Sequence, residues 1–206
     1  MPLTQGRAFA IMNVVQFGGI FVNNIVTSRE EILQTSRALL RDKGWDAVNI
    51  RGVAAACGVS VGSIYNYFGS KEELTSAVVE SVWHEIFRCP EGEEAFSDTL
   101  GCIRWLYGRM AAGCRDYPGF FTLHAVGLLQ SEKAAGKQRM EKSWHHIRQM
   151  LEQVLRRDPN VRPEAFSGGF TPAAYAQILF SLLLGAMLRG DYDPAAVLEV
   201  TRRTLY

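Results

Sequence analysis

The sequence of 206 residues lacks a strong excess of charge of either sign, and it lacks the motifs that mark most enzymes. Its formal net charge is +1, so any surface for nucleic acid must be local rather than spread over the molecule. It contains no nucleophile elbow, phosphate-binding loop, HExxH motif or paired carboxylate set. These absences argue against an enzyme. Enzymatic turnover that survives deletion of residues 1–75 would support that alternative.

Cysteines are few and do not pair at metal-binding spacing. The four stand 32, 13 and 12 residues apart, at Cys57, Cys89, Cys102 and Cys114. This spacing indicates neither a secreted disulfide framework nor a zinc ribbon, and reduced thiols in a cytoplasmic protein are the simpler interpretation. Two adjacent histidines, His145 and His146, point about 100° apart on a helix and cannot easily share one metal ion. We therefore expect no metal and no cofactor.

One apolar run stands at the N-terminus, over residues 8–26. Asn13, Gln16, Asn23 and Asn24 interrupt it, no small-residue cleavage site follows, and a membrane span wants about 20 uninterrupted apolar residues. Two interpretations stay open: an arm that lies on the body, or an upstream start that extends the true domain. No other segment resembles a membrane span, so we expect no membrane partner.

Almost every periodic segment predicts helix, and no segment alternates like a strand. The first helix is expected from a capping box at Thr27 and Ser28 to about Asp42. The further helices are expected over 50–57, 61–68, 70–88, 93–114, 118–131, 133–157, 171–189 and 194–205. The sequence therefore predicts an all-α protein, in which one long helix joins a small N-terminal helical unit to a larger helical body.

The most informative stretch is the short helix expected over 61–68. In projection, Val61, Ile64 and Phe68 form a compact apolar face, which predicts that they anchor the helix to a core. The opposite face carries the small polar set Gly62, Ser63 and Asn66, with Tyr65 and Tyr67 on its two flanks. Small residues let a backbone approach base edges, while amides and hydroxyls bond to bases and phosphates.

This helix follows a helix over 50–57 and a turn at Gly58, which together predict a helix-turn-helix. Lys71 adds a positive charge at the start of the next helix, and Asn49 and Ser60 cap helix starts that favour anions. Residues 27–71 hold six basic and four acidic side chains, a weak electrostatic footprint for one copy.

The run from Arg29 to Val79 resembles the N-terminal domain of TetR-family transcriptional regulators. The matching stretches are EEIL at 30–33, the Gly44-Trp45 pair, and NIRGVAAACGVSVGSIYNYFGSKEEL at 49–74. The resemblance implies a helix-turn-helix at about 49–68 within a DNA-binding domain over 27–75. It also implies that residues 76–206 form a ligand-sensing and dimerising body, and it leaves the role of residues 1–26 open.

The resemblance implies roles for single residues as well. Tyr65 matches a tyrosine that contacts DNA, Tyr67 an aromatic or histidine position that holds a phosphate, and Lys71 a lysine that meets the backbone. Asn49 stands where a threonine usually caps the second helix and faces phosphate. The predicted DNA-binding residues are Asn49, Ser60, Val61, Gly62, Ser63, Tyr65, Asn66, Tyr67 and Lys71.

The body offers candidates for an effector pocket, most of which are as easily explained as ordinary core residues. An aromatic interior with one or two polar groups suits an apolar or aromatic small molecule. His124 is the polar group of interest, although a satisfied core histidine would look the same in the sequence. The predicted pocket residues are Trp83, Trp105, Met110, Phe121, His124 and Trp144.

The segment 170–190 is apolar nearly all round, which predicts burial on more than one side. With the last helix it is a candidate for a two-fold four-helix interface, for which we name Leu182, Gly185, Ala186 and Leu198. A helix buried within one subunit is the alternative.

These features predict a cytoplasmic homodimeric repressor that an effector releases from an inverted-repeat DNA operator. A helical dimeric adaptor that no longer binds DNA is the alternative. The sequence names neither the effector nor the operator, and it does not separate repressor from activator.

Overall fold

The chain is helical throughout the residues that its computed structural model describes, which are 27–88, 96, 98–121 and 134–206. No strand occurs among these residues, so the all-α fold class expected from the sequence is confirmed. The helices are α1 (Arg29–Lys43), α2 (Ile50–Cys57), α3 (Val61–Tyr67), α4 (Lys71–Ile86), α5 (Thr99–Asp116), α7 (Ala134–Arg157), α8 (Pro172–Arg189) and α9 (Ala195–Leu205). Two 3-10 turns, η1 (Trp45–Ala47) and η2 (Pro163–Ala165), complete the set.

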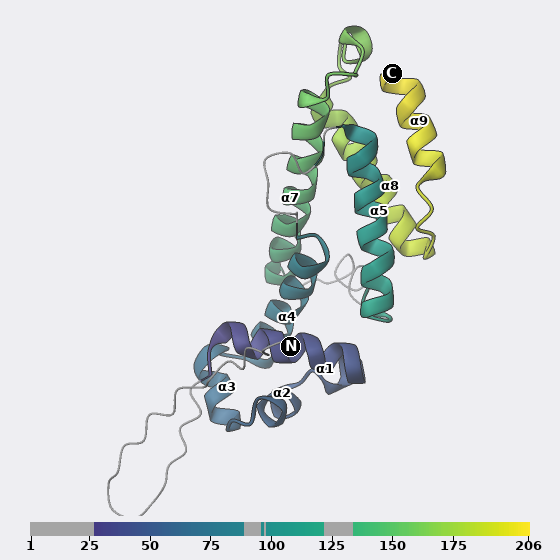
Figure 1. Ribbon diagram of the computed structural model, residues 1–206. Helices are drawn as coiled ribbons and strands as arrows, with labels where there is room; N and C mark the ends of the chain where they lie inside the picture. The colour runs from purple at the N-terminus through teal and green to yellow at the C-terminus, as the bar shows by residue number, and fades with distance from the viewer. Residues whose placement is uncertain (1–26, 89–95, 97, 122–133) are drawn as a thin grey trace, which may run out of the picture.

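Figure 1 shows α1, α2 and α3 grouped at one end of the molecule, with α5, α7, α8 and α9 at the other. We call the first group the N-terminal unit and the second the body. Helix α4 runs from one to the other and contacts α1, α5 and α7. The arrangement leaves α2 and α3 pointing away from the body.

Side-chain caps explain where the helices of the N-terminal unit begin. Ser28 and Glu31 form a reciprocal capping box at the start of α1, and Asn49 accepts a hydrogen bond from the amide of Gly52 at the start of α2. Such caps satisfy amides that have no partner within the helix. Gly52 has a second role, because a Cβ at this position would lie 2.3 Å from the carbonyl oxygen of Ala47.

The turn between α2 and α3 depends on Gly58, whose φ of 68° and ψ of 26° place it in the left-handed region. Glycine adopts this conformation without a steric penalty. Ser60 then caps α3 by accepting a hydrogen bond from the amide of Ser63. The helix-turn-helix geometry therefore follows from local sequence.

The body is built on two long helices, α7 and α8, which pack against one another, while α5 lies against α7 and α9 lies against α5. Seven residues of α8 are buried, including Tyr175, Leu179 and Leu183. By length and composition alone α8 is apolar enough to cross a membrane, a property that the sequence interpretation gave to no segment beyond residue 26. Packed core helices pass the same test, and α8 packs in this way.

Tyr206, which follows α9, contacts a buried carboxylate of the body. Asp158 is buried and accepts hydrogen bonds from the hydroxyl of Tyr206 and from the backbone amides of Thr99 and Asn160. Burial alone would raise the pKa of this carboxyl, but the hydrogen bonds outweigh burial and lower the pKa. One carboxylate therefore ties the end of α9 to the start of α5 and the end of α7.

Most helix bounds agree with the sequence prediction to within one or two residues, the largest exception being the helix predicted over 93–114. It begins at Thr99 and ends at Asp116, because Asp98 supplies its N-cap. Only the first residues of the helix predicted over 118–131 are described, and they turn helical at Phe120. The rest of that prediction lies outside the described residues.

Candidate nucleic-acid interface and adjoining cleft

Two buried side chains hold the short helix α3 in place. Ile64 and Phe68 are both fully buried, and they pack into the core that also includes Ile32, Val53 and Leu74. Burying side chains of this size contributes about 1.5 to 3 kcal/mol each. A helix of seven residues is too short to be stable alone, so these two anchors explain its existence.

The expected third anchor, Val61, is a correction. Its side chain is 41% exposed, because it occupies the first position of α3, beyond the reach of the core that holds Ile64 and Phe68. Val61 therefore joins the outward face, where an apolar side chain can contact a thymine methyl group.

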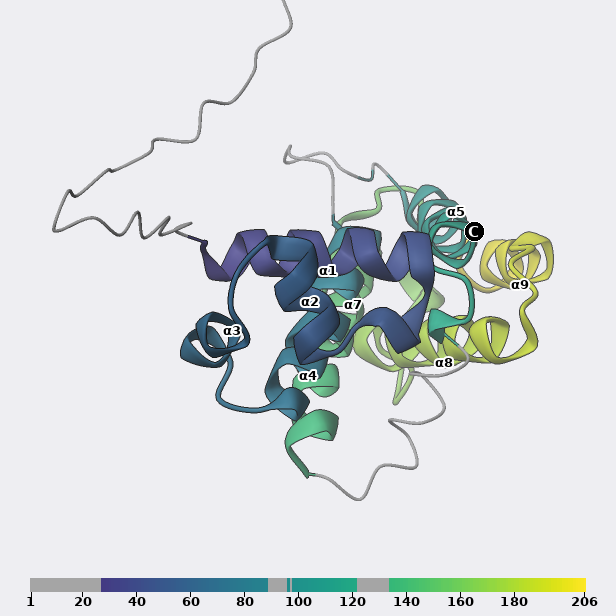
Figure 2. The ribbon, with the colours of Figure 1, turned by 90° about the horizontal axis from the view of Figure 1, so that it is seen from below.

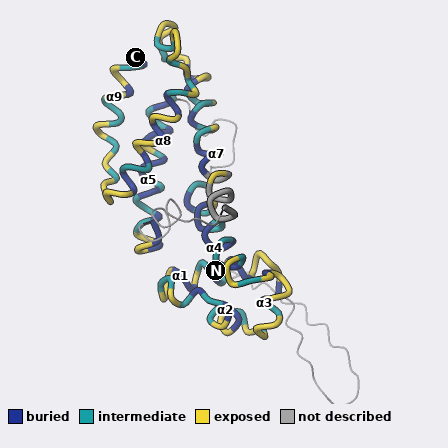
Figure 3. The backbone as a smooth tube through the Cα atoms, turned by 180° about the vertical axis from the view of Figure 1, so that it is seen from behind, coloured by how far each residue is buried: buried dark blue, intermediate teal, exposed yellow. Residues whose placement is uncertain are grey.

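The rest of the outward face is exposed as the projection predicted, except that Ser63 is only partly exposed. Tyr65 is 47% exposed and Tyr67 is 38% exposed, and Gly62 and Asn66 between them are also exposed. Figure 3 shows this exposed region at the tip of the molecule. The face thus combines two phenol rings with a small polar centre.

Gly62 leaves the centre of this face open. A Cβ added there would meet only the Oγ of Ser60, at 3.6 Å, which is an ordinary van der Waals separation. The chain itself therefore has no steric need for glycine at this position. Close approach of another molecule is a physical reason to keep the side chain absent.

The polar side chains of the helix-turn-helix differ in how many hydrogen-bonding groups remain free. Asn49 uses its Oδ1 on the amide of Gly52, at 2.9 Å, and one N–H on the carbonyl of Asp46, at 3.0 Å. The hydroxyls of Ser60 and Ser63 lie 2.9 Å apart and share a hydrogen bond. The hydroxyl of Tyr65 has no hydrogen-bond partner among the described residues.

Tyr67 differs from Tyr65 because its hydroxyl donates to the backbone carbonyl of Thr27. Next to this bond, the guanidinium of Arg29 lies 4.9 Å from the ring centre of Phe68. The start of α1 is therefore fastened to the end of α3. The sequence interpretation missed both contacts, since nothing in the pattern links residues about 40 positions apart.

Two exposed cations lie on the helices that precede and follow α3 in the chain. Arg51 lies in the first turn of α2 and Lys71 in the first turn of α4, and no described residue forms an ion pair with either. Both lie at helix N-termini, where free amides and the helix dipole favour anions. The surface is suited to a polyanion whose charges flank a groove.

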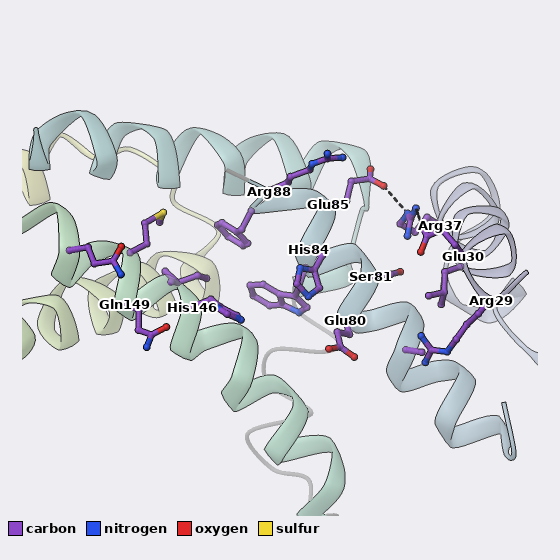
Figure 4. Close-up of a pocket in the computed structure, with 17 residues that line it drawn as sticks. Arg29, Glu30, Arg37, Glu80, Ser81, His84, Glu85, Arg88, His146 and Gln149 are labelled. Atoms are coloured by element: carbon purple, nitrogen blue, oxygen red, sulfur yellow. Dashed lines mark hydrogen bonds and ion pairs between the residues drawn. The ribbon is translucent and has the colours of Figure 1, made fainter. Parts of the chain in front are cut away.

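A cleft with a volume of about 950 Å³ adjoins the N-terminal unit. Figure 4 shows its labelled side chains: Arg29, Glu30 and Arg37 project from α1, while Glu80, Ser81 and His84 project from α4 and His146 and Gln149 from α7. Apolar side chains of the cleft include Trp83, Phe87 and Met150. The indole of Trp83 stacks on Phe87 at 5.4 Å, and its Nε1 has no hydrogen-bond partner among the described residues.

Of the five predicted pocket residues that the structure describes, Trp83 alone lines this cleft. Trp105 packs on Phe96, and Trp144 packs on Phe180 with a ring separation of 5.7 Å. Met110 and Phe121 are buried in the core, and His124 lies outside the described residues. Trp105, Met110, Phe121 and Trp144 therefore do not line this cleft, and their assignment to an effector pocket stays a prediction. The large side chains that mark a pocket in a sequence also build ordinary core. Arg37 and Glu85, which do line it, carried no distinctive signal.

Helices α8 and α9 carry a second exposed surface. Ile178 and Leu182 are 47% and 38% exposed on α8, and Val200 is 55% exposed on α9. Ile178, Leu182 and Gly185 fall within about 60° of one another in helical projection. Of the predicted interface residues, Leu182 is exposed, Gly185 and Leu198 are partly so, and Ala186 is a correction. Ala186 is 1% exposed, because this small residue lies on the buried side of α8, within the chain's own core.

The described residues contain no group of three or more histidine, cysteine or carboxylate side chains that could hold a metal ion. The three described cysteines, Cys57, Cys102 and Cys114, form no disulfide bond. Burial raises the pKa of the Cys57 thiol, which disfavours the reactive thiolate.

Comparison with known proteins shows which family has a similar N-terminal unit. The family model described as bacterial regulatory proteins, tetR family, matches residues 32–78, a range that covers most of α1, all of α2 and α3, and half of α4. Over residues 32–78 the chain is therefore similar to the N-terminal domain of TetR-family proteins. TetR-family proteins are transcriptional regulators, and the comparisons indicate no catalytic family.

Among known proteins of similar sequence, the nucleoid occlusion factor SlmA of Vibrio cholerae is 29% identical over 139 residues, 65% of this chain and 69% of SlmA. The repressor KstR2 of Mycolicibacterium smegmatis is 32% identical over 59 residues, 29% of each chain. The repressor Rv3405c of Mycobacterium tuberculosis is 34% identical over 90 residues, 42% of this chain and 47% of its own length. The alignments to the two repressors thus span less than half of each relative.

Solved structures show the same fold along most of the chain. Reduced NemR of Escherichia coli has a TM-score of 0.62 at 22% identity, covering 86% of this chain and 97% of its own. FadR of Bacillus subtilis, solved with stearoyl-CoA, has a TM-score of 0.60 at 13% identity and covers 85% of this chain and 96% of its own. Identities this low establish the fold alone.

Proposed function

We propose that this protein is a TetR-family homodimeric repressor that reads an inverted-repeat DNA operator through the outward face of α3. The observation that carries the proposal is the combination on one seven-residue helix: two buried anchors behind, and Val61, Gly62, Tyr65, Asn66 and Tyr67 exposed in front. The division into a DNA-binding domain over 27–75 and an effector and dimerisation domain over 76–206 is part of the proposal. It acts where bacterial DNA lies, in the cytoplasm.

In the proposed complex α3 lies in the major groove. Asn66 and Ser63 bond to base edges, Val61 contacts an apolar base group, and Tyr65 and Tyr67 reach phosphates on the two walls. Lys71, with the capped helix starts at Asn49 and Ser60, contacts the backbone. Gly62 lets the helix backbone approach the bases.

The apolar surface of α8 and α9 supports a dimer. Exposed aliphatic side chains grouped on one helix face are typical of protein interfaces, and an inverted repeat requires two copies related by a two-fold axis. Dimerisation also doubles a modest set of contacts and charges. We assign Leu182, Gly185 and Leu198 to this interface, together with Ile178 and Val200.

For the effector we propose an apolar or aromatic small molecule that occupies the cleft between α1, α4 and α7. Trp83, Phe87 and Met150 supply flat apolar contact, and the cleft is large enough for a drug-sized ligand. The solved relatives include FadR with stearoyl-CoA and the multidrug binding protein EbrR with imidazole. The ligand acts by binding one orientation of the N-terminal unit better than another.

The alternative is a dimeric adaptor that has lost DNA binding. Selection of bound fragments from random DNA, at a fixed salt concentration and with the full chain, separates the two. Recovery of an inverted repeat, whose binding weakens steeply as salt rises, supports the repressor. Recovery of no shared sequence contradicts the repressor. Repeating the selection in the presence of apolar and aromatic compounds tests whether an effector releases the protein from DNA.

A further inference from the structure

The last turn of α4 carries a polar cluster that the proposed function leaves unexplained. The two carboxylate oxygens of Glu85 accept ion-pair or hydrogen-bond contacts from three side chains. Its Oε2 lies 2.8 Å from Nε of Arg37, while its Oε1 lies 2.7 Å from Nη2 of Arg41 and 2.8 Å from the hydroxyl of Tyr117. We call these four residues the Glu85 cluster.

The cluster connects parts of the molecule that are distant in sequence. Arg37 and Arg41 lie on α1 of the N-terminal unit, whereas Tyr117 directly follows α5 of the body. Arg41 also donates to the Tyr117 hydroxyl, at 2.7 Å, and its guanidinium lies 5.0 Å from the Tyr117 ring centre. The three side chains Glu85, Arg41 and Tyr117 therefore form a closed triangle.

Tyr117 is a stable donor within this triangle. It is 1% exposed, and burial together with its hydrogen bond to the negatively charged Glu85 raises its pKa to about 12. The phenol therefore keeps its proton at any physiological pH. The hydrogen bond from Tyr117 to Glu85 does not depend on pH in this range.

Helix α5 fixes Glu85 to the body from the other side. Arg109 donates to the backbone carbonyl of Glu85, at 2.9 Å, and to that of Ile86. Gly113 makes this approach possible, since a Cβ there would lie 2.7 Å from the Ile86 side chain. The end of α4 is thus held by α5, and the two arginines attach α1 to that fixed point.

The geometry of the cluster restricts orientation more than it adds stability. The side chains of Glu85 and Arg41 are 40% and 44% exposed, and partly exposed ion pairs contribute about 1 kcal/mol or less each. However, the two carboxylate oxygens of Glu85 have different partners. One oxygen contacts Arg37, and the other contacts Arg41 and Tyr117. A rotation of α1 over α4 breaks one set or the other.

From this geometry we infer that Glu85 is a positioning residue that sets the tilt of the N-terminal unit on the body, and thereby the half-site spacing that the dimer accepts. The inference rests on the proposed function. In Figure 2, α3 lies at the end of the N-terminal unit away from α5 and α9. A small rotation at the cluster therefore moves α3, and in a dimer it changes the separation of the two recognition helices.

The proposed effector cleft adjoins the same point, because Arg37 and Glu85 line it. An occupant that displaces either side chain would release α1 from the end of α4. The cluster thus gives a physical route from ligand to spacing: one set of polar contacts that exists in one tilt and is lost in another.

The test compares Glu85→Gln with Glu80→Gln in the full-length dimer. Both changes remove one carboxylate from the same helix and the same cleft, but Glu80 forms no ion pair with any described residue. In Glu85→Gln, the amide that replaces the carboxylate would turn an N–H donor toward Arg37 or Arg41. Binding is measured on operator fragments whose half-sites are moved apart or together one base pair at a time, and on a single half-site.

We expect wild type and Glu80→Gln to favour one spacing by about tenfold over its neighbours, and Glu85→Gln to favour it by about threefold or less. Single half-site affinity should be equal in all three proteins, because α3 is untouched. Tyr117→Phe removes one hydroxyl from the cluster and should relax spacing in the same direction by less. A Glu85→Gln profile that matches wild type overturns the inference.

A second readout does not use DNA, so it separates this inference from the proposed function. Spin labels carried by non-canonical residues at the exposed positions Arg51 and Arg157 report the distance between the N-terminal unit and the body. Measurements use labelled chains diluted into unlabelled ones. The distance distribution should broaden in Glu85→Gln and stay narrow in Glu80→Gln. An unchanged distribution in Glu85→Gln overturns the inference even if an operator is found, whereas broadening without any sequence-specific DNA binding defeats only the proposed repressor.

Discussion

Helices α3 and α8 both expose large side chains, yet the chemistry of the two surfaces differs. On α3 the exposed groups are Val61 and two phenols, separated by Gly62 and Asn66. On α8 they are aliphatic, with Ile178 and Leu182 on one face. Protein–DNA interfaces are wet, polar and positively charged, whereas dimer interfaces are more apolar. This difference in side-chain chemistry supports assigning DNA to the α3 face and a second copy of the chain to the α8 face.

The largest expected effect breaks the α8 surface. Leu182→Glu places a charge in the proposed dimer interface, so we expect the dimer dissociation constant to rise by at least about a hundredfold, equivalent to about 2.7 kcal/mol. Operator affinity should fall with it. Ala173→Glu, also exposed on α8 but in its first turn, serves as the control. Analytical ultracentrifugation of both variants decides the matter, and a Leu182→Glu protein that remains dimeric would contradict the assignment.

The next effect concerns the placement of α9, whose last turn depends on Asp158. Asp158→Asn should lower the free energy of unfolding at pH 7 by about 2 kcal/mol, because buried hydrogen bonds to a charged group are lost. Since the folded-state pKa of Asp158 is lowered, its contribution is present above the unfolded pKa near 4 and is lost as pH falls through the folded pKa.

The difference between wild type and Asp158→Asn should therefore shrink below about pH 4. Urea unfolding from pH 7 to pH 3 measures it, with the exposed Asp42→Asn as the control. A difference that stays constant over this range would show that the charge of Asp158 plays no part.

A smaller effect sharpens the description of α3 by separating its two phenols. The hydroxyl of Tyr65 has no described partner, so Tyr65→Phe should leave thermal stability unchanged and weaken operator binding about fivefold, or about 1 kcal/mol. Tyr67→Phe should lower both, because its hydroxyl also donates to Thr27. Calorimetry and fluorescence anisotropy measure the two quantities. Equal affinity of Tyr65→Phe and wild type would remove Tyr65 from the contact set.

The smallest effect concerns charge. Lys71→Gln should weaken binding on all DNA sequences alike, and should reduce the slope of log affinity against log salt by about one. Lys43→Gln, an exposed lysine at the far end of α1, should leave the slope unchanged. Titrations at several salt concentrations measure the slopes, and equal slopes for the two variants would exclude a phosphate contact by Lys71.

The sequence predicted the N-terminal unit far better than it predicted the cleft or the Glu85 cluster. Caps at Asn49 and Ser60 and the turn at Gly58 are local features, so their geometry follows from neighbouring residues. The prediction that Val61 anchors α3 to the core was wrong because helical projection ignores where a helix begins and ends. The prediction that Ala186 lies in a dimer interface was wrong because a small residue permits close packing inside one chain as readily as between two.

The features that sequence patterns did not reveal are long-range and polar. Glu85 meets Arg41 from 44 positions away, and Arg41 meets Tyr117 from 76 positions away. No periodicity marks such partners, because each residue alone looks like an ordinary surface charge. The predicted pocket residues show the opposite problem, since Trp144 and Met110 have side chains typical of a pocket but are buried in the core.

Close approach of the outward face of α3 to DNA can be measured by comparing Gly62→Ala with Gly108→Ala. Both glycines are exposed on helices, and an added Cβ meets no close neighbour at either. Each change should raise the free energy of unfolding, by up to about 1 kcal/mol. Affinity for the selected operator is measured for both variants against wild type. We expect affinity to fall about tenfold or more for Gly62→Ala and not at all for Gly108→Ala. Unchanged affinity in a stable, dimeric Gly62→Ala protein would show that α3 does not approach DNA closely.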